Sequence, residues 1–264
     1  MDDDFYVSLI SNTTDKKKEN TISKFTTYLP HKRNLGNNVY EVALVSFSYQ
    51  HSWLHLYSNE AFFSIKKQSS EEFKVFNIPP GHYDSNETFI NALNALLNDE
   101  YESFFEYKTK LNQVFLHIKN HETVILNTYL ASILGFEHTG YQHVFDIEEE
   151  LLALPKNGID LNIRTHNIFI YAEDLVENSL VGDHYYPLLS IIGTNDTNYN
   201  KYVTWTNPDR SYIRVINNDI SKIKISILDD NEKPIRFMSG RTILWLHFRK
   251  KNTLSHLIEI VKKQ

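Results

Sequence analysis

Short runs of β-branched and aromatic residues recur along most of this 264-residue chain, and they restrict its fold more than any other feature. Polar segments separate the runs, and many runs alternate apolar with polar residues, the pattern of strands with one buried face. In residues 222–227, for example, three isoleucines alternate with two lysines and a serine. Because the runs show no regular alternation with helices, we expect an antiparallel β-sandwich. The runs expected to form strands are residues 5–10, 25–29, 39–49, 61–66, 159–171, 185–192, 212–215, 220–228 and 242–248.

The composition agrees with a folded β protein. Tyr and Phe each occur 16 times, whereas Gly occurs 8 times and Met twice, a bias that favours pleated, half-buried surfaces over helical bundles. Hydrophobic residues make up 41% and charged residues 23%, so the chain has enough apolar surface to bury a core. Its length suits one large β domain with an insertion, or two small domains. We expect one compact unit over residues 1–264.

One stretch departs from the strand pattern. The turn sequence Ile-Pro-Pro-Gly-His-Tyr is followed by Asp84 or Ser85, either of which offers a side-chain N-cap. Apolar residues then recur at helical spacing, so we predict an amphipathic helix over residues 85–98, the longest of the chain. A second, short helix is predicted to end at Gly135, a C′ residue. Residues 79–137 are therefore expected to form a small α+β excursion within the β framework.

Sequence motifs of catalysis are missing. Without cysteine the chain has no disulfide, no thiolate nucleophile and no thiolate metal ligand. It also lacks a phosphate-binding glycine loop, the HExxH zinc motif and the GxSxG nucleophile motif. His51 and His55 follow an expected strand with no carboxylate at a fixed spacing, so we interpret them as surface or subunit-contact residues. Asp183 and His184 are interpreted as a turn before a strand. We expect no enzyme activity, no cofactor and no metal.

Charge and terminal sequence bear on where the chain works. Lys and Arg total 27 and Asp and Glu total 33, a net charge of −6, whereas a surface built to grip nucleic acid is normally basic. The acidic first four residues lack the basic start and apolar core of a secretory signal, and no apolar run approaches the roughly 20 residues that span a bilayer. We therefore expect no membrane span and a protein made and kept in the cytosol or nucleus.

Several short blocks of sequence occur in the order found in one known family. The set begins with Phe-Tyr-Val-Ser-Leu at residues 5–9 and includes Tyr-Gln-His-Ser-Trp at 49–53, Leu-Gly-Phe at 134–136 and Leu-Val-Gly-Asp at 180–183. The other blocks are residues 25–29, 40–45, 78–83, 168–175, 187–189 and 240–249, with Phe237 before the last. Together they resemble the minor capsid (penton) proteins of Polinton or Maverick elements, adintoviruses and virophage relatives.

The resemblance implies a mainly β chain with an antiparallel jelly-roll sandwich: one capsid domain over residues 1–264, an inserted α+β subdomain at 79–137 and a C-terminal tail at 250–264. It implies that five copies form the pentameric vertex of an icosahedral shell of a double-stranded DNA virus or virus-like transposon. The implied partners are the chain itself, as a homopentamer, and a double jelly-roll major capsid protein. Weak contact of basic segments with packaged DNA is the minor hypothesis. The implied location is the capsid vertex of the virion, after synthesis in the host cytoplasm and with assembly there or in the nucleus.

In such a ring, exposed aromatic and apolar side chains would supply the contacts between neighbours, because Tyr and Trp offer large contact area at low entropy cost. The subunit-contact candidates are Tyr49, Trp53, Tyr57, Tyr185, Tyr186, Leu254, Leu257, Ile258 and Val261. For Trp53, a place in the core is an equal alternative. The last four candidates share one face of a predicted helix in the tail, which is buried either on its own subunit or under a neighbour. Deleting residues 253–264 would distinguish these two by its effect on assembly.

Two other functions are open from the residues alone. The first is a carbohydrate-binding β-sandwich, a spike or attachment module that uses exposed Trp and Tyr as platforms for sugars. The second is a hydrolase acting through Asp or Glu, which only scattered carboxylates support. A glycan titration would separate the first from a capsid role, and loss of a measured activity on carboxylate substitution would be needed for the second.

Overall fold

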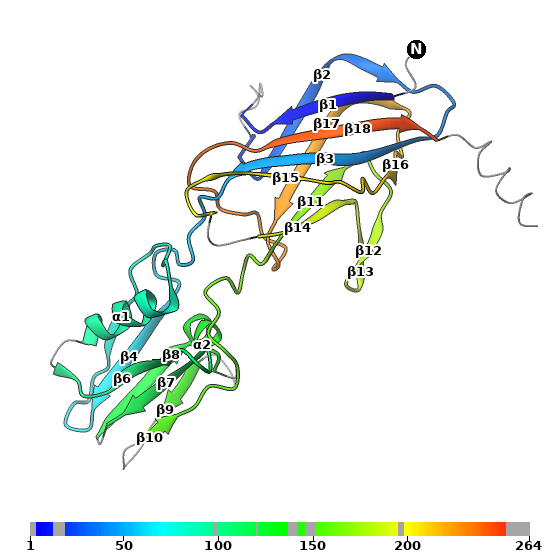
Figure 1. Cartoon of the computed structure of the whole chain (residues 1–264). Coiled ribbons are helices and arrows are strands. Elements are labelled where there is room, and N and C mark those ends of the chain that lie inside the picture. Colours follow the sequence, from blue (N-terminus) through cyan, green and yellow to red (C-terminus); the bar gives the residue numbers. More distant parts are fainter. Residues whose placement is uncertain are drawn as a thin grey trace, which may run out of the picture. The chain divides into compact units, whose positions relative to one another are not determined.

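A computed structural model of the chain describes residues 4–12, 19–97, 100–119, 121–136, 142–145, 151–194 and 198–251 (Figure 1). The chain divides into two compact units. One consists of Met1–Trp53 together with Arg164–Gln264, and the other, here called the insert, is Leu54–Ile163. The expectation of a single compact unit over residues 1–264 is therefore wrong, because the chain buries two separate hydrophobic cores.

The first unit contains two antiparallel sheets, and every strand pair in them is antiparallel. The first sheet has the strand order β1 (Asp4–Ile10), β18 (Ile243–Lys250), β3 (Tyr40–Gln50) and β15 (Tyr202–Thr206), with the short β16 (Ile213–Arg214) also paired to β3. The second sheet has the order β14 (Leu188–Gly193), β11 (Asn167–Glu173), β17 (Asp219–Leu228) and β2 (Lys24–Asn34). A small hairpin of β12 (Ser179–Val181) and β13 (His184–Tyr186) lies between β11 and β14 in the chain.

The strand order defines a jelly roll. The eight long strands of this unit, taken along the chain, are β1, β2, β3, β11, β14, β15, β17 and β18. The first sheet holds the first, eighth, third and sixth of them, and the second sheet holds the fifth, fourth, seventh and second. All but one of the connections between consecutive strands therefore cross from one sheet to the other, as in a jelly roll. The predicted antiparallel jelly-roll sandwich is confirmed, and this unit is called the jelly roll below.

Alternation along the strands explains how the two sheets bury a common core. Ile223, Ile225 and Ile227 of β17 are buried between the sheets, while Lys222 and Lys224 on the same strand face solvent. Inward-facing residues of the other strands join these isoleucines in one cluster that includes Leu44, Phe47 and Phe248. Each such side chain contributes about 1.5–3 kcal/mol when it is fully buried. The period-two pattern predicted for residues 222–227 is confirmed.

The insert is an α+β unit with its own core. Its first sheet has the order β5 (Lys74–Asn77), β4 (Phe62–Lys67), β8 (Glu122–Asn127) and β9 (Gln142–Phe145), and its second has β10 (Leu151–Ala153), β7 (Gln113–Ile118) and β6 (Phe104–Lys108). Two helices, α1 (Asn86–Leu97) and α2 (Thr128–Leu134), pack with these sheets around a cluster that includes Phe63, Phe89 and Leu116. Neither helix described here is long and apolar enough to cross a bilayer.

The predicted bounds of the insertion, residues 79–137, were too narrow. Residues 61–66 do form a strand, but it pairs with β5 and β8 of the insert and not with the jelly roll. The run 159–171 is one strand only from Asn167 onward, because Ile159 and Leu161 are buried in the core of the insert. An apolar run shows that a segment is buried but not in which core, because that depends on pairing with distant strands.

The two predicted helices are confirmed. Helix α1 follows Ser85, whose hydroxyl accepts a hydrogen bond from the Thr88 amide at 3.1 Å as an N-cap. Helix α2 ends at Gly135, which has φ 84° and donates from its amide to the carbonyls of the last turn. Among the described residues α1 is the longer helix.

Gly135→Ala is expected to destabilise the insert strongly. Its left-handed backbone alone costs a residue with a side chain about 1–3 kcal/mol. A Cβ at this position would also lie 2.2 Å from the Asn157 carbonyl oxygen. Urea denaturation should show the loss, and Gly81→Ala, whose Cβ would meet nothing within 4 Å, is the matched control. Equal stabilities for the two variants would contradict the described turn.

Candidate assembly surfaces

The outer face of the first jelly-roll sheet carries a group of aromatic and basic side chains, here called the arginine face. Residues 5 and 248 point into the core, so Tyr6 and His247, each one position away, point outward and lie directly opposite each other in the β1–β18 ladder. Trp245 lies two residues from His247 and shares its face. The arginine face is made of Tyr6, Arg210, Tyr212, Trp245, His247 and Arg249.

The rings of the arginine face contact one another. Tyr6 has ring centroids 4.4 Å from His247 and 4.9 Å from Trp245. The Tyr212 hydroxyl lies 2.6 Å from His247 Nδ1, and the guanidinium of Arg249 lies 3.5 Å above the Tyr212 ring. Tyr6 is 47% exposed and Trp245 is 43% exposed. Two large rings that are fixed by stacking but half open to solvent are typical of a contact surface.

Arg249 and Arg210 differ in their charge partners. Arg249 donates to Glu41 Oε2 at 3.0 Å, and the Lys251 ammonium lies 3.0 Å from Glu41 Oε1. Burial alone would raise the pKa of Glu41, but the hydrogen bonds and charges of Lys251 and Arg249 outweigh it and hold that pKa below its usual value. Arg210 instead interacts with the side chains of Tyr212 and Tyr6, which raise the pKa of its guanidinium. Among the described residues it forms no ion pair with a carboxylate.

Protonation of His247 should make the jelly roll less stable in mild acid. Burial lowers its pKa below 6.5, Arg210 and Arg249 lower it further, and Asp4 opposes them. The unfolded chain therefore binds a proton at His247 more readily than the folded chain. As a result, the free energy of unfolding falls as the pH drops below about 6.5, and above that pH His247 does not change it. Urea denaturation at pH 5.5 and pH 7.5 should show a smaller pH dependence for His247→Gln than for the wild type.

His184→Gln is the matched control for this experiment, because the His184 side chain is 64% exposed. If His247→Gln and the wild type lose the same stability between the two pH values, the lowered pKa of His247 in the folded chain is contradicted.

The outer face of the second jelly-roll sheet holds a depression of about 420 Å³, here called the tyrosine depression. Its apolar lining is Tyr171, Tyr186, Pro187, Leu228 and Pro234, and its polar lining is Lys24, Glu173, Ser226 and Glu232. The rings of Tyr171 and Tyr186 meet edge to face with centroids 5.7 Å apart. Register explains part of this lining, because Tyr171 pairs with Ser226 and Ser226 with Lys24 across three neighbouring strands.

Each carboxylate of the tyrosine depression accepts one hydrogen bond from the described residues. The Ser226 hydroxyl donates to Glu173 Oε1 at 2.7 Å, and the Tyr186 hydroxyl donates to Glu232 Oε2 at 3.2 Å. Burial, followed by the nearby charge of Glu232, raises the pKa of Tyr171. The depression thus combines aromatic walls with two carboxylates, while Lys24 supplies a positive charge.

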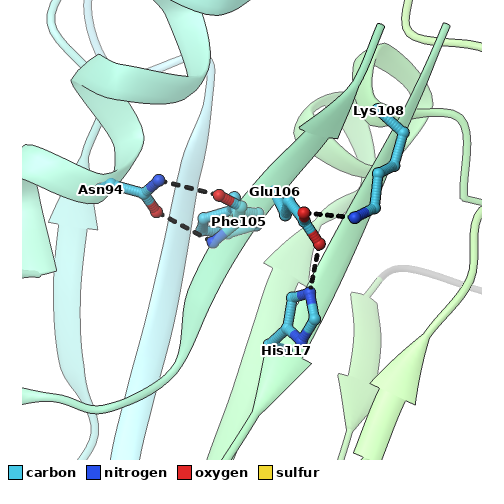
Figure 2. Close-up of polar contacts among 5 residues, drawn as sticks. All are labelled: Asn94, Phe105, Glu106, Lys108 and His117. Atoms are coloured by element: carbon cyan, nitrogen blue, oxygen red, sulfur yellow. Dashed lines mark hydrogen bonds and ion pairs between the residues drawn. The ribbon is translucent and has the colours of Figure 1, made fainter. Parts of the chain in front are cut away.

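The insert has a polar network on β6 and β7 (Figure 2). Glu106 accepts hydrogen bonds from Lys108 and, at 2.8 Å, from His117, and these two partners hold the pKa of Glu106 below its usual value. Asn94 of α1 donates to the Phe105 carbonyl at 2.8 Å and accepts from its amide at 2.9 Å. Asn94 therefore fixes the helix against the free edge of β6. The side chains of the network neutralise one another, and Figure 2 shows them on the strand surface.

No group of three or more His, Asp or Glu side chains within the described ranges is arranged to hold a metal ion.

Comparison with known proteins gave no matching family model and no matching curated sequence. Two solved structures are similar over most of their length. The mavirus penton protein is 13% identical, with a TM-score of 0.49, and the match covers 94% of this chain and 99% of that one. A chain of the Sputnik virophage is 14% identical, with a TM-score of 0.48, and the match covers 96% and 99%.

The sequence-predicted contact residues lie in different environments. Tyr185 is 70% exposed on β13, and Tyr186 lines the tyrosine depression. Tyr57 is half-buried in the insert, where its hydroxyl accepts a hydrogen bond from the Leu54 amide. The candidates Leu254, Leu257, Ile258 and Val261 lie outside the described residues.

Tyr49 and Trp53 are not surface residues. Both are only 3% exposed, and they stack on each other in the core of the jelly roll with ring centroids 5.8 Å apart. Their proposed role as contact residues is wrong for the folded chain, because neither ring offers area to a neighbour. For Trp53 the alternative of a core position is confirmed.

The sequence interpretation missed the arginine face. Tyr6 and Trp245 are far apart in the chain and meet only because β1 pairs with β18. The local signal was present, since both residues alternate with core residues of their strands and must therefore point outward. What the pattern could not supply is the pairing that brings them together.

Proposed function

We propose that this chain is a structural minor capsid protein of the penton type. Five copies would close each vertex of an icosahedral shell, among trimers of a double jelly-roll major capsid protein. The observation that carries the proposal is the complete eight-stranded jelly roll, with the insert placed between its third and fourth strands. Jelly rolls are the fold of many viral capsid subunits, and of lectins and cupins as well. The ordered sequence blocks that resemble penton proteins favour the first of these.

The surfaces of the jelly roll suit a ring. A subunit in a closed ring makes two different contacts, one with each neighbour, so it needs two different contact surfaces. The arginine face and the tyrosine depression lie on the outer faces of different sheets, and both present aromatic rings beside charged groups. Aromatic residues and arginine are the side chains that contribute most to binding energy at protein interfaces.

The part of the chain that the structure describes contains one jelly roll, which fits a vertex protein rather than the major shell protein. A double jelly roll needs two such units in tandem, whereas the second unit here is an α+β insert with sheets of different order. The major capsid protein is therefore proposed as a separate partner, and the virion vertex as the place where the chain acts.

Coexpression with a double jelly-roll major capsid protein from the same source tests this function. Shells imaged by electron microscopy should carry fivefold vertices occupied by this chain, and shells made without it should have open vertices. Closed shells that exclude the chain would refute the proposal.

A carbohydrate-binding module is the second candidate, and the tyrosine depression is the observation that favours it. Two tyrosine rings beside carboxylates resemble the apolar platform and polar rim that bind a pyranose ring. Titration with neutral glycans, followed by the Tyr intrinsic fluorescence, distinguishes this candidate. Saturable binding that Tyr186→Ala abolishes would support it.

A further inference from the structure

We propose that the arginine face of one copy docks on the tyrosine depression of the next copy, with Arg210 entering between the two carboxylates. The inference rests on the proposed function and specifies the contact that would close the ring. It assigns each neighbour a different surface of the same chain.

The state of Arg210 favours this contact. Its guanidinium has five N–H donors, and the structure gives it two side-chain partners, Tyr212 and Tyr6. Arg249, the other arginine of this face, is already paired with Glu41. Arg210 is thus the cation of this surface that best fits an external carboxylate, and the half-exposed ring of Tyr6 stands beside it.

The chemistry of the tyrosine depression suits a guanidinium. Glu173 Oε1 and Glu232 Oε2 each accept one internal hydrogen bond, and among the described residues their second oxygens accept none. A guanidinium placed between these carboxylates would gain charge-assisted hydrogen bonds and would stack on the Tyr171 and Tyr186 rings. Pro187 and Pro234 supply apolar surface for the partner's aromatic rings.

The positions of the two surfaces select a neighbouring copy in this orientation. The two surfaces belong to the outer faces of different sheets of one sandwich, so one copy cannot bring its own arginine face to its own depression. A symmetric pairing of two arginine faces would bring Arg210 against Arg210, and like charges repel. A contact between unlike surfaces repeats from copy to copy until the ring closes.

Charge reversal at the two positions tests the contact. We expect Arg210→Glu and Glu232→Arg each to raise the concentration for half-assembly by roughly 100-fold or more, because each places like charges together. The double variant should recover much of the assembly that each single variant loses, since the 210–232 pair is restored with its signs exchanged while Glu173 still faces a carboxylate at position 210. Sedimentation velocity measures the masses, and circular dichroism confirms that each variant is folded. Arg241→Glu, an exposed arginine outside the arginine face, is the matched control and should assemble normally.

The outcomes separate this inference from the proposed function. If the wild type forms pentamers and the single variants do too, or the folded double variant assembles no better than the single variants, the docking contact is refuted while the capsid function stands. If the wild type neither assembles alone nor joins shells, the function itself fails. If Glu232→Arg leaves assembly unchanged but abolishes glycan binding, the depression takes a sugar, and the docking contact is likewise refuted.

Discussion

Phe248→Ala is expected to lower the free energy of unfolding of the jelly roll by about 3–5 kcal/mol. Phe248 is 0% exposed at the centre of β18, and its ring stacks on Phe5 with centroids 4.7 Å apart and 5° between the planes. Removing the ring leaves a cavity between two sheets that cannot both move inward. Because small domains are stable by only about 5–15 kcal/mol, this loss is large enough to prevent assembly at physiological temperature.

Trp245→Ala on the same strand is the control for this prediction. Its ring packs at a tilt against Tyr6 but faces outward, so its removal should cost less than about 1.5 kcal/mol. Denaturant unfolding of the purified variants measures both. An order in which Trp245→Ala is the more damaging change would contradict the assignment of faces in β18.

Phe63→Ala is expected to produce a loss of similar size, about 3–5 kcal/mol, but in the insert. Phe63 is 0% exposed, stacks on Phe76 at 5.1 Å and meets the Phe105 ring edge to face at 5.5 Å. The core to which it belongs contains residues of the insert alone. Hydrogen exchange should therefore accelerate in β4 and β8, while β11 and β17 of the jelly roll keep their protection.

Phe104→Ala is the matched control, since this ring belongs to the insert but lies on its surface, 37% exposed and stacked on His117. It should leave exchange in β4 and β8 nearly unchanged. Equal acceleration of exchange in the insert and the jelly roll by Phe63→Ala would contradict the division into two separate cores.

The strands and helices were largely predictable because their signals are local. Alternation in β17 and the capping residues of α1 and α2 depend only on neighbours within a few positions. Whether a strand belongs to the jelly roll or to the insert was not predictable in this way. Residues 61–66 have the composition of a jelly-roll strand, yet they pair with Thr123 and Val124 of the insert. This pairing depends on residues that are distant in the sequence.

The contact residues were harder to predict, for a related reason. Tyr49 was expected on the surface because it stands near a strand end, but it shares a strand face with Phe47 and is buried with it. A register shift opposite Trp245 and Leu246 changes which residues of β3 face inward, from Val42 and Leu44 to Phe47 and Tyr49. Alternation from Phe47 onward carries the signal for Tyr49, whereas the bulge itself has no local signature.

The solution mass of the purified full chain tests the central claim most directly. Sedimentation velocity over a range of protein concentrations measures it without a partner or a label. The account predicts a species of five times the 31.0 kDa chain mass, which gives way to single chains when Arg210 is replaced by Glu. A wild-type protein that remains at 31.0 kDa at every concentration, and also when mixed with a double jelly-roll major capsid protein, would contradict it.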